Sequence, residues 1–302
     1  MQFRLECHEV LESTSSLVKQ RAEDGAAEGL AIQALRQSAG RGRQGRGWES
    51  PAGNLYISVL LRPAVPLRDA PQWSFVAAVA LAETLLLIAS HEACHGTLLG
   101  KPRLELVLAA LISWPMAWPL LTYRLLHRLH HRWNGCDRRD PERIQVQQPG
   151  CWWRLVLAGG AGLILRTLQE ALRLQAQQPA LRRALLLDGL GIVLVQALFL
   201  ALAIQHGHLL AYALCWLVVE RVAGALLQLR GAIEHWHLWD PQPHPLLTQL
   251  YGSRTVAVPD WLNGWLGGLP HHSAHHAFPA IATGRLPQAT ARLQAVLRAH
   301  GY

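Results

Sequence analysis

The sequence predicts an α-helical integral membrane protein, a bundle of apolar helices, with a small α/β region at its N-terminus. Of the 302 residues, 51% are hydrophobic and only 16% are charged, whereas soluble domains carry about 25% charged residues. Long apolar runs begin after about residue 74, and several approach the ~20 residues that a helix needs to cross a bilayer. Residues 1–70, by contrast, hold polar clusters, a Gly/Arg-rich loop and one strand-like run, 54–61.

Charge and cysteine usage exclude several classes of protein. The net charge is +8, and arginine supplies nearly all of the positive charge, because Lys19 and Lys101 are the only lysines. In a membrane protein this excess is typical of cytoplasmic loops that face anionic lipid, so we expect no nucleic-acid partner. The five cysteines include no C-x-x-C pair, which argues against a disulfide framework, a zinc ribbon and an iron–sulfur cluster. The N-terminus lacks an apolar signal core, so no cleaved signal peptide is expected.

Four apolar runs are candidate membrane helices, and a shorter run, 152–165, is expected to be interfacial or re-entrant. The four are 74–90, 104–126, 184–204 and 208–229. Only residues 205–208 link the last two, which predicts a tight helical hairpin whose two linking histidines are loop residues rather than ligands. Arg182, Arg183 and Arg230 stand at the open end of this hairpin, which favours a cytoplasmic location for that end.

Three histidine clusters are the most specific feature of the chain. Positions i, i+3 and i+4 share one face of a helix, so each cluster aims its imidazoles in one direction. Neutral imidazole suits iron, zinc or copper, and eight convergent imidazoles exceed what one metal uses, so two metals are predicted. Isolated surface histidines near lipid headgroups are the weaker alternative, because two clusters repeat the spacing H-x-x-H-H. The clusters are His91 and His95; His127, His130 and His131; and His272, His275 and His276.

Convergence of the first two clusters constrains the segment between them. A single helix crossing would separate His95 from His127 by about 30 Å. The run SWPMAWP, residues 113–119, carries two prolines, which break a helix. Segment 104–126 is therefore expected to form a hairpin or a kinked pair, or to lie in the interface.

Residues 87–300 resemble the membrane fatty acid desaturase and hydroxylase family. The motifs HEACHG, HRLHH followed by RWNGCDRRDPE, and LNGWLGGLPHHSAHHAFP match family patterns in the correct order. The resemblance implies two iron ions, O2 as co-substrate, and desaturation or hydroxylation of a lipid acyl chain. It also implies an external electron donor of the ferredoxin, rubredoxin or cytochrome type. The expected location is the bacterial inner membrane, with the metal site facing the cytoplasm.

The resemblance also assigns roles to single residues. Family members often carry a further ligand histidine after a glutamate, and His235 of GAIEHWH stands at that place; a plain interfacial histidine is the alternative. Asn263 stands where some members have an asparagine close to the metal. Glu92, inside the first cluster, is a candidate partner for an imidazole N–H. Asp137 and Asp140 are candidates for the same role, although solvated loop charges are the preferred interpretation.

The N-terminal region resembles the start of the catalytic domain of biotin–protein ligases. The matching stretches are LESTSS (11–16), AIQALRQSAGRGRQGRGW (31–48) and SPAGNLYISVLLRP (50–63). In that family a Gly/Arg loop closes over biotin and its adenylate; glycines let the backbone approach an anion and arginines neutralise phosphate. A flexible Arg/Gly-rich loop is the alternative. The resemblance implies biotin and ATP as cofactors of this fragment, with contacts from Ser13, Thr14, Gln37, Arg41, Arg43 and, near the adenine, Trp48.

The ligase-like fragment is incomplete. The family continues into a Lys-Trp-Pro-Asn-Asp motif whose lysine supports adenylation, and neither Lys19 nor Lys101 stands at that place. The two resemblances meet at about 84–90, so we expect an incomplete ligase-like region, 1–86, and a desaturase-like di-iron domain, 87–302. The leading hypothesis for function is a lipid oxidoreductase. The alternatives are an incomplete biotin–protein ligase and a non-functional fusion of two truncated genes.

Overall fold

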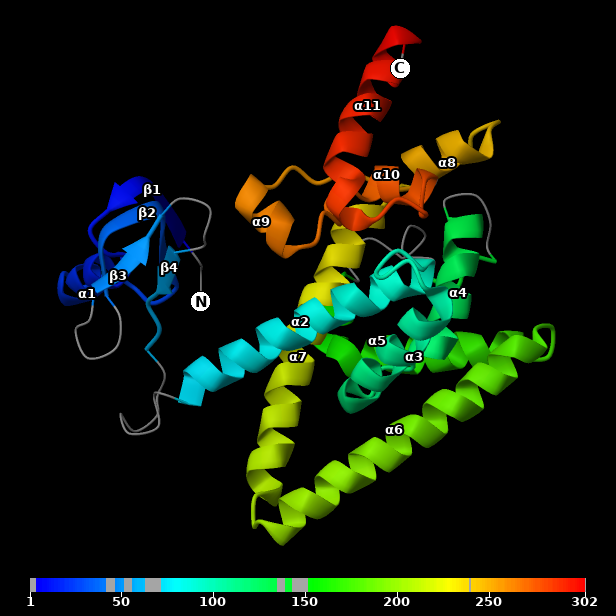
Figure 1. The fold of residues 1–302 in the computed structure, drawn as a ribbon, viewed down its shortest axis with the longest axis horizontal. Helices are drawn as coiled ribbons and strands as arrows, with labels where there is room; N and C mark the ends of the chain where they lie inside the picture. Colours follow the sequence, from blue (N-terminus) through cyan, green and yellow to red (C-terminus); the bar gives the residue numbers. More distant parts are fainter. Residues whose placement is uncertain are drawn as a thin grey trace. The chain divides into compact units, whose positions relative to one another are not determined.

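The structure is a computed structural model, and it describes residues 4–41, 47–51, 56–62, 72–134, 139–142, 152–238 and 240–301 (Figure 1). The chain forms two compact units, Met1–Trp73 and Ser74–Tyr302. Of the residues singled out above, Arg43 and Asp137 lie outside the described residues.

The N-terminal unit is a four-stranded sheet with one helix. Strand β1 (Arg4–Leu11) is followed by helix α1 (Thr14–Glu23) and by β2 (Leu30–Arg41), which pairs in parallel with β1. Strand β2 also pairs antiparallel with β3 (Gly47–Ser50) and β4 (Tyr56–Val59). Strand β4 lies within the strand-like run that the sequence predicts. The small core under α1 consists of Val18, Leu30, Ile32 and Leu60.

The second unit is helical. Its longer helices are α2 (Gln72–His95), α3 (Pro102–Ser113), α4 (Leu120–Trp133), α5 (Trp152–Leu174), α6 (Pro179–Gln205), α7 (Leu209–His235) and α11 (Leu286–Ala299). Its shorter ones are η3 (Trp114–Met116), α8 (Pro245–Tyr251), α9 (Asp260–Trp265), α10 (His272–Ala277) and η5 (Thr283–Arg285).

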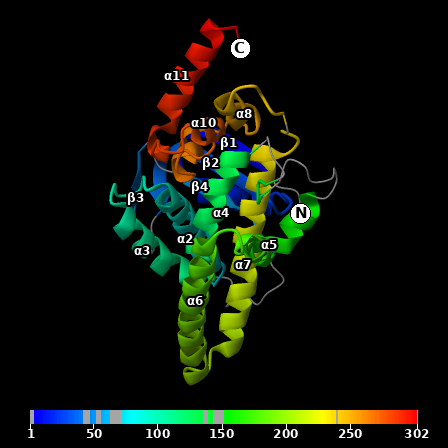
Figure 2. The ribbon, with the colours of Figure 1, turned by 90° about the vertical axis from the view of Figure 1, so that its right-hand side faces the viewer.

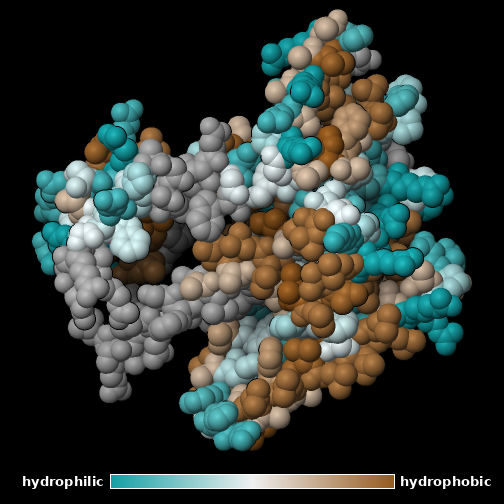
Figure 3. All heavy atoms as spheres, viewed as in Figure 1, coloured by the Kyte–Doolittle hydropathy of each residue, from teal (hydrophilic) through white to brown (hydrophobic). Residues whose placement is uncertain are grey.

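Helices α6 and α7 are the two that are long and apolar enough to cross a membrane among the described residues. The link between them is short, as predicted, and its histidines, His206 and His208, are exposed. Figures 1 and 2 place this turn at the opposite end of the helical unit from α10 and α11. Large apolar side chains cover the hairpin, and Figure 3 shows the hydrophobic surface that results. Leu186, Val193 and Leu210 are 66%, 64% and 71% exposed, which a lipid environment would cover favourably.

The proline-rich link bends the chain as predicted. Helices α3 and α4, with η3 between them, are long and apolar enough for a membrane span only as a pair, and they are bent by 110° at the break between them. Ala117 in the link has a positive φ of 51°, and Pro119 directly precedes α4. A second break lies in α5, where Gly159 has a φ of 60°.

Asp188 of α6 holds this bend against the hairpin of α6 and α7. Its side chain is 1% exposed, and its carboxylate accepts hydrogen bonds from the Trp114 indole N–H at 3.0 Å and from the Thr122 backbone N–H at 2.8 Å. The Leu121 backbone N–H donates to the same carboxylate at 3.3 Å. The two backbone groups belong to the first turn of α4, whose N–H groups have no partner within the helix and whose dipole favours an anion. The position of α4 relative to α6 therefore depends on one carboxylate.

The variant Asp188→Ala is expected to destabilise the helical unit by on the order of 3 kcal/mol, because it leaves three donors, one buried and two half-buried, without an acceptor. Asp188→Asn keeps one acceptor oxygen and should fall between this variant and the wild type. The measurement is the apparent Tm of the detergent-solubilised chain. Gly189→Ala is the matched control, since a Cβ there meets no described atom within 4 Å. An unchanged apparent Tm for Asp188→Ala would contradict the role given to this carboxylate.

Candidate metal centre

Nine histidine side chains from four helices converge in the second unit. The helices α2, α4 and α7 end within or directly after the histidines that they contribute, and α10 begins at His272. Gly96, with a φ of 75°, follows the last histidine of α2, as expected for a helix that stops there. The carbonyl ends of three helices therefore lie at the histidines, and their dipoles favour bound cations.

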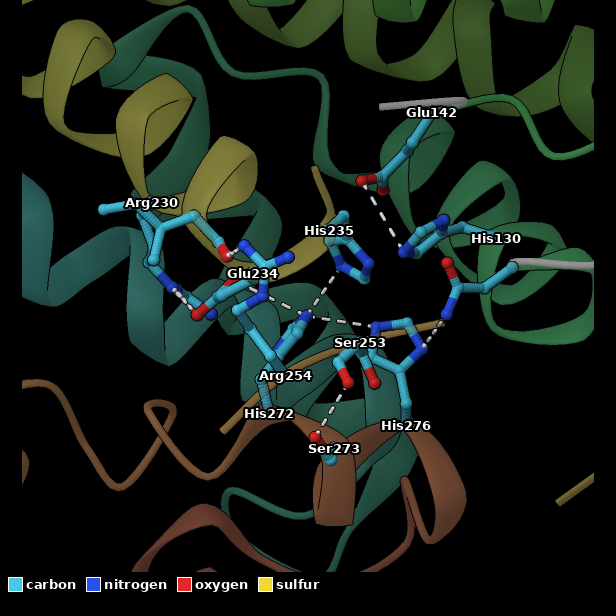
Figure 4. A network of polar contacts seen from close by, with 12 residues as sticks. His130, Glu142, Arg230, Glu234, His235, Ser253, Arg254, His272, Ser273 and His276 are labelled. Atoms are coloured by element: carbon cyan, nitrogen blue, oxygen red, sulfur yellow. Dashed lines mark hydrogen bonds and ion pairs between the residues drawn. The ribbon is translucent and has the colours of Figure 1, made fainter. Parts of the chain in front are cut away.

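The imidazoles form two groups. The groups are defined by ligand nitrogens that lie within 4.8 Å of one another. The five-histidine group consists of His91, His95, His127, His131 and His275. The four-histidine group consists of His130, His235 and His276, to which His272 is joined through contacts with His235 and His276. Figure 4 shows the four-histidine group.

Each H-x-x-H-H cluster contributes to both groups, which differs from the expectation that it aims three imidazoles in one direction. His127 and His131 belong to one group and His130 to the other; His272 and His276 belong to one group and His275 to the other. The residues at i and i+4 stay together, and the residue at i+3 crosses over. Positions i+3 and i+4 differ by about 100° around a helix, so one cluster reaches two neighbouring sites.

Outer contacts turn the Nε2 atoms of three histidines of the four-histidine group inward. The Nδ1 atom of His235 lies 3.0 Å from a backbone carbonyl oxygen, and that of His276 lies 3.2 Å from a glutamine amide oxygen. The Nδ1 atom of His130 lies 2.9 Å from Asp140 Oδ1. The Nε2 atom of His272 then lies 2.8 Å from that of His235 and 3.1 Å from that of His276. Imidazoles held in this way are oriented to bind a metal.

Several ring nitrogens in the two groups are buried and have no hydrogen-bond partner among the described residues. Both ring nitrogens of His275 are in this condition, although its side chain is only 1% exposed. Buried polar atoms without a partner are rare in native proteins, and a metal ion bound within each group would partner one ring nitrogen of each histidine. The residues therefore fit a pair of metal ions. The other unpartnered atoms are His91 Nδ1, His95 Nε2, His131 Nδ1 and His272 Nδ1.

Burial also sets the protonation of α10. Desolvation, and to a smaller extent the neighbouring imidazoles, hold the pKa values of His272, His275 and His276 well below the usual histidine value. These side chains are neutral near pH 7, because burial disfavours the charged form. Neutral imidazole is the form that binds a metal.

The preferred interpretation of Asp140 as a solvated loop charge is wrong. Its side chain is fully buried and contacts His130, because the segment after α4 folds back onto that helix. Glu142, which sequence reasoning missed, lies in the same segment: its Oε1 atom is 3.1 Å from His127 Nδ1. Its position two residues after Asp140, in the segment that follows the second histidine cluster, was the signal available in the sequence.

Glu92 and Asn263 have other contacts. Glu92 Oε2 accepts hydrogen bonds from the Thr97 hydroxyl at 2.9 Å and the Thr283 backbone N–H at 3.0 Å, while Oε1 lies 3.7 Å from His91 Nδ1. Glu92 thus ties the end of α2 to the segment before α11. The Asn263 amide nitrogen lies 3.4 Å from His271 Nε2, and His271 belongs to neither histidine group.

A cavity of about 170 Å³ adjoins both histidine groups. Members of each group form part of its wall. The rest is apolar along one side, and Arg166, Thr167 and Arg230 give it a polar side. The apolar side is formed by Leu87, Ile88, Trp118, Leu126, Leu163 and Leu227.

The N-terminal unit brings together part of the predicted biotin site. Gln37 Oε1 accepts hydrogen bonds from the Thr14 backbone N–H at 2.7 Å and hydroxyl at 3.1 Å. Ser13 and Thr14 are buried, whereas Arg41 and Trp48 are exposed. Gln37 and Trp48 line one shallow pocket on this unit.

Comparison with known proteins separates the two parts of the chain. The fatty acid desaturase family matches residues 70–302, which is most of the chain. The chain belongs to the fatty acid desaturase family. This family is membrane-bound, which agrees with the apolar hairpin of α6 and α7. The biotin/lipoate A/B protein ligase family matches residues 7–112, so both resemblances read from the sequence are confirmed, and the two matches overlap over 70–112.

Curated relatives match the N-terminal part. The chain is 43% identical over 77 residues to the bifunctional ligase/repressor BirA of Bacillus subtilis strain 168, covering 25% of this chain and 24% of that protein. It is 50% identical over 54 residues to the biotin–[acetyl-CoA-carboxylase] ligase of Paracoccus denitrificans, covering 18% of this chain and 22% of that protein. The chain thus spans less than a quarter of the length of these relatives.

Asp140→Asn is expected to weaken divalent metal binding at the four-histidine group by about 10–100-fold, the usual effect of losing the outer partner of a ligand histidine. The five-histidine group should bind as before. Competition with a chromophoric chelator measures both affinities. Asp240→Asn, at an exposed position, is the control. Equal affinities in Asp140→Asn and the wild type would show that this contact does not orient His130 for a metal.

Proposed function

We propose that this chain is a membrane di-iron oxidoreductase that uses O2 to desaturate or hydroxylate a lipid acyl chain. The observation that carries the proposal is the convergence of nine histidines into two adjacent groups beside a partly apolar cavity. Membership of the fatty acid desaturase family supports the reaction class.

The two groups assign ligands to two metals. The five-histidine group would hold one iron and the four-histidine group the other, since imidazole is a good ligand for iron. When bound, the two irons supply the electrons that activate O2 and an oxidant strong enough for an unactivated C–H bond. His235 is the ninth ligand in this assignment, and Glu92, with Oε1 3.7 Å from His91 Nδ1, keeps a supporting role at the first group. Asn263 contacts His271 rather than a ligand histidine, so any role for it at the metals is indirect.

The side chains around the cavity position the substrate and exclude water. The apolar side receives the acyl chain, and His91, His127 and His272 form the wall beside it. A cavity of about 150 Å³ holds benzene, so this one holds about six carbon atoms, and the rest of the chain lies outside. Desaturation takes two hydrogens from adjacent carbons; two further electrons and two protons reduce O2 to two waters. The electrons come from an external donor of the ferredoxin, rubredoxin or cytochrome type.

The location follows from charge. Arg182 and Arg183 stand at the start of α6, and Arg230 near the end of α7, at the end of the hairpin where the histidines lie. Arginine at membrane helix ends favours the cytoplasmic side. We infer that the metal centre faces the cytoplasm in a bacterial inner membrane.

We infer that the N-terminal region, 1–86, is a remnant of a biotin–protein ligase joined to the desaturase domain, 87–302. The contact of Thr14 with Gln37 and the pocket beside Trp48 favour retained affinity for biotin or its adenylate. Neither lysine of the chain matches the family's adenylation motif, so no ligation is expected.

Iron content tests the di-iron proposal. Wild-type chain purified in mild detergent should bind about two irons per chain, because nine nitrogen donors are available for two sites. His275→Ala should lose the iron of the five-histidine group and His276→Ala that of the four-histidine group, so each variant keeps about one. His244→Ala, an exposed histidine outside both groups, should keep two. A monodisperse wild-type preparation without iron would contradict the proposal and would favour a non-functional fusion of two truncated genes.

Biotin transfer tests the N-terminal region. Purified chain given ATP, radiolabelled biotin and a biotin carrier domain should label the carrier no more than a sample without enzyme, because the adenylation lysine is missing. A complete biotin–protein ligase serves as the positive control. Labelling by the wild type that is lost in Gln37→Ala would overturn this expectation.

A further inference from the structure

One carboxylate lies among the inward-facing nitrogens of the four-histidine group. Glu234 precedes His235 at the end of α7, and its side chain is 4% exposed. Its Oε2 atom lies 3.5 Å from His272 Nε2. One carboxylate oxygen and the ligand nitrogens of His235 and His272 all lie within 4.8 Å of one another. Figure 4 shows Glu234 pointing from α7 towards His272.

The other nearby carboxylates are placed differently. Asp140 and Glu142 make their shortest contacts with Nδ1 atoms, on the outer side of the imidazoles. Glu142 is also 3.8 Å from His130 Nε2, but its side chain is 28% exposed. Glu92 accepts its hydrogen bonds from a hydroxyl and a backbone N–H. Glu234 instead approaches the Nε2 atom of His272, the same atom that faces His235 and His276.

This placement limits what Glu234 can do when a metal is present. An imidazole nitrogen that binds a metal carries no hydrogen, so His272 Nε2 then has nothing to donate to a carboxylate. The neighbouring ion pair fixes the other oxygen: Arg230 Nε donates to Glu234 Oε1 at 2.7 Å. Only Oε2 is left to face the histidines, and Arg230 offsets the cost of burying the negative charge.

We propose that Glu234 supplies a carboxylate oxygen to the metal of the four-histidine group. This inference rests on the proposed function, since it requires that the two groups hold metals. One site then has five nitrogen donors, and the other has four nitrogens and one anionic oxygen. The two metals are inequivalent, because a carboxylate is a harder ligand than imidazole and carries a charge.

Titration of the metal-free chain with Co²⁺ tests the assignment, because visible absorption of Co²⁺ reports its ligands. The wild type should bind two Co²⁺ ions. Glu234→Gln should keep one at wild-type affinity and bind the second on the order of 100-fold more weakly, with altered absorption bands. Glu234→Asp keeps the charge but shortens the side chain by one methylene, so a ligand role predicts the same loss, and a role in charge balance predicts near-wild-type binding.

Glu105→Gln is the matched control, since that carboxylate is also buried, accepts its hydrogen bonds from backbone N–H groups outside both histidine groups, and should leave both sites nearly unchanged. Two Co²⁺ ions with wild-type affinity and bands in Glu234→Gln would overturn the inference. Equal weakening of both sites without a change of the absorption bands would overturn it too. Loss of both Co²⁺ ions in both Glu234 variants would also overturn it, because a ligand role for Glu234 leaves the five-histidine group intact. A wild-type chain that binds no Co²⁺ would contradict the proposed function instead.

Discussion

The packing of nine buried or half-buried imidazoles into an apolar helical unit is the constraint on which the rest of the structure depends. Each ring nitrogen in such a setting needs a partner. The outer nitrogens of His130, His235 and His276 have a carboxylate, a carbonyl and an amide oxygen as partners, respectively. The nitrogens on the inner side face one another. That arrangement suits cations between the rings, and the three helix C-termini at the same place supply a matching partial negative charge.

Contacts outside the histidine groups help to position the helices that carry the histidines. Asp188 joins the start of α4 to α6, and Glu92 joins the end of α2 to Thr283. Helices α5 and α7 approach so closely that a Cβ at Gly224 would overlap the backbone of Gly160, which fixes the end of α7 that carries His235. The hairpin of α6 and α7 therefore supports the helices that carry the histidine groups.

Sequence reasoning predicts the elements better than their contacts. The hairpin of α6 and α7 follows from a four-residue link between apolar runs, and the bend between α3 and α4 follows from two prolines. The division of the histidines into two groups does not follow from the sequence. Spacing alone places His130 on the same face as His127 and His131, and the neighbouring histidines that separate them come from α7 and α10. In the sequence, Asp140 looks like an ordinary loop charge and Glu234 like any residue beside a histidine. The burial of these side chains and the direction in which they point depend on tertiary packing, which the sequence does not display.

The most direct test of the proposed lipid oxidation is product analysis with ¹⁸O2. Iron-loaded chain in lipid vesicles, given a reductant and an electron carrier, is compared with His275→Ala by mass spectrometry of the acyl chains. A lipid oxidoreductase should yield acyl chains that have lost two hydrogens or gained one ¹⁸O atom, and it should do so with the wild type alone. Acyl chains unchanged by an iron-loaded wild type would contradict a lipid oxidoreductase.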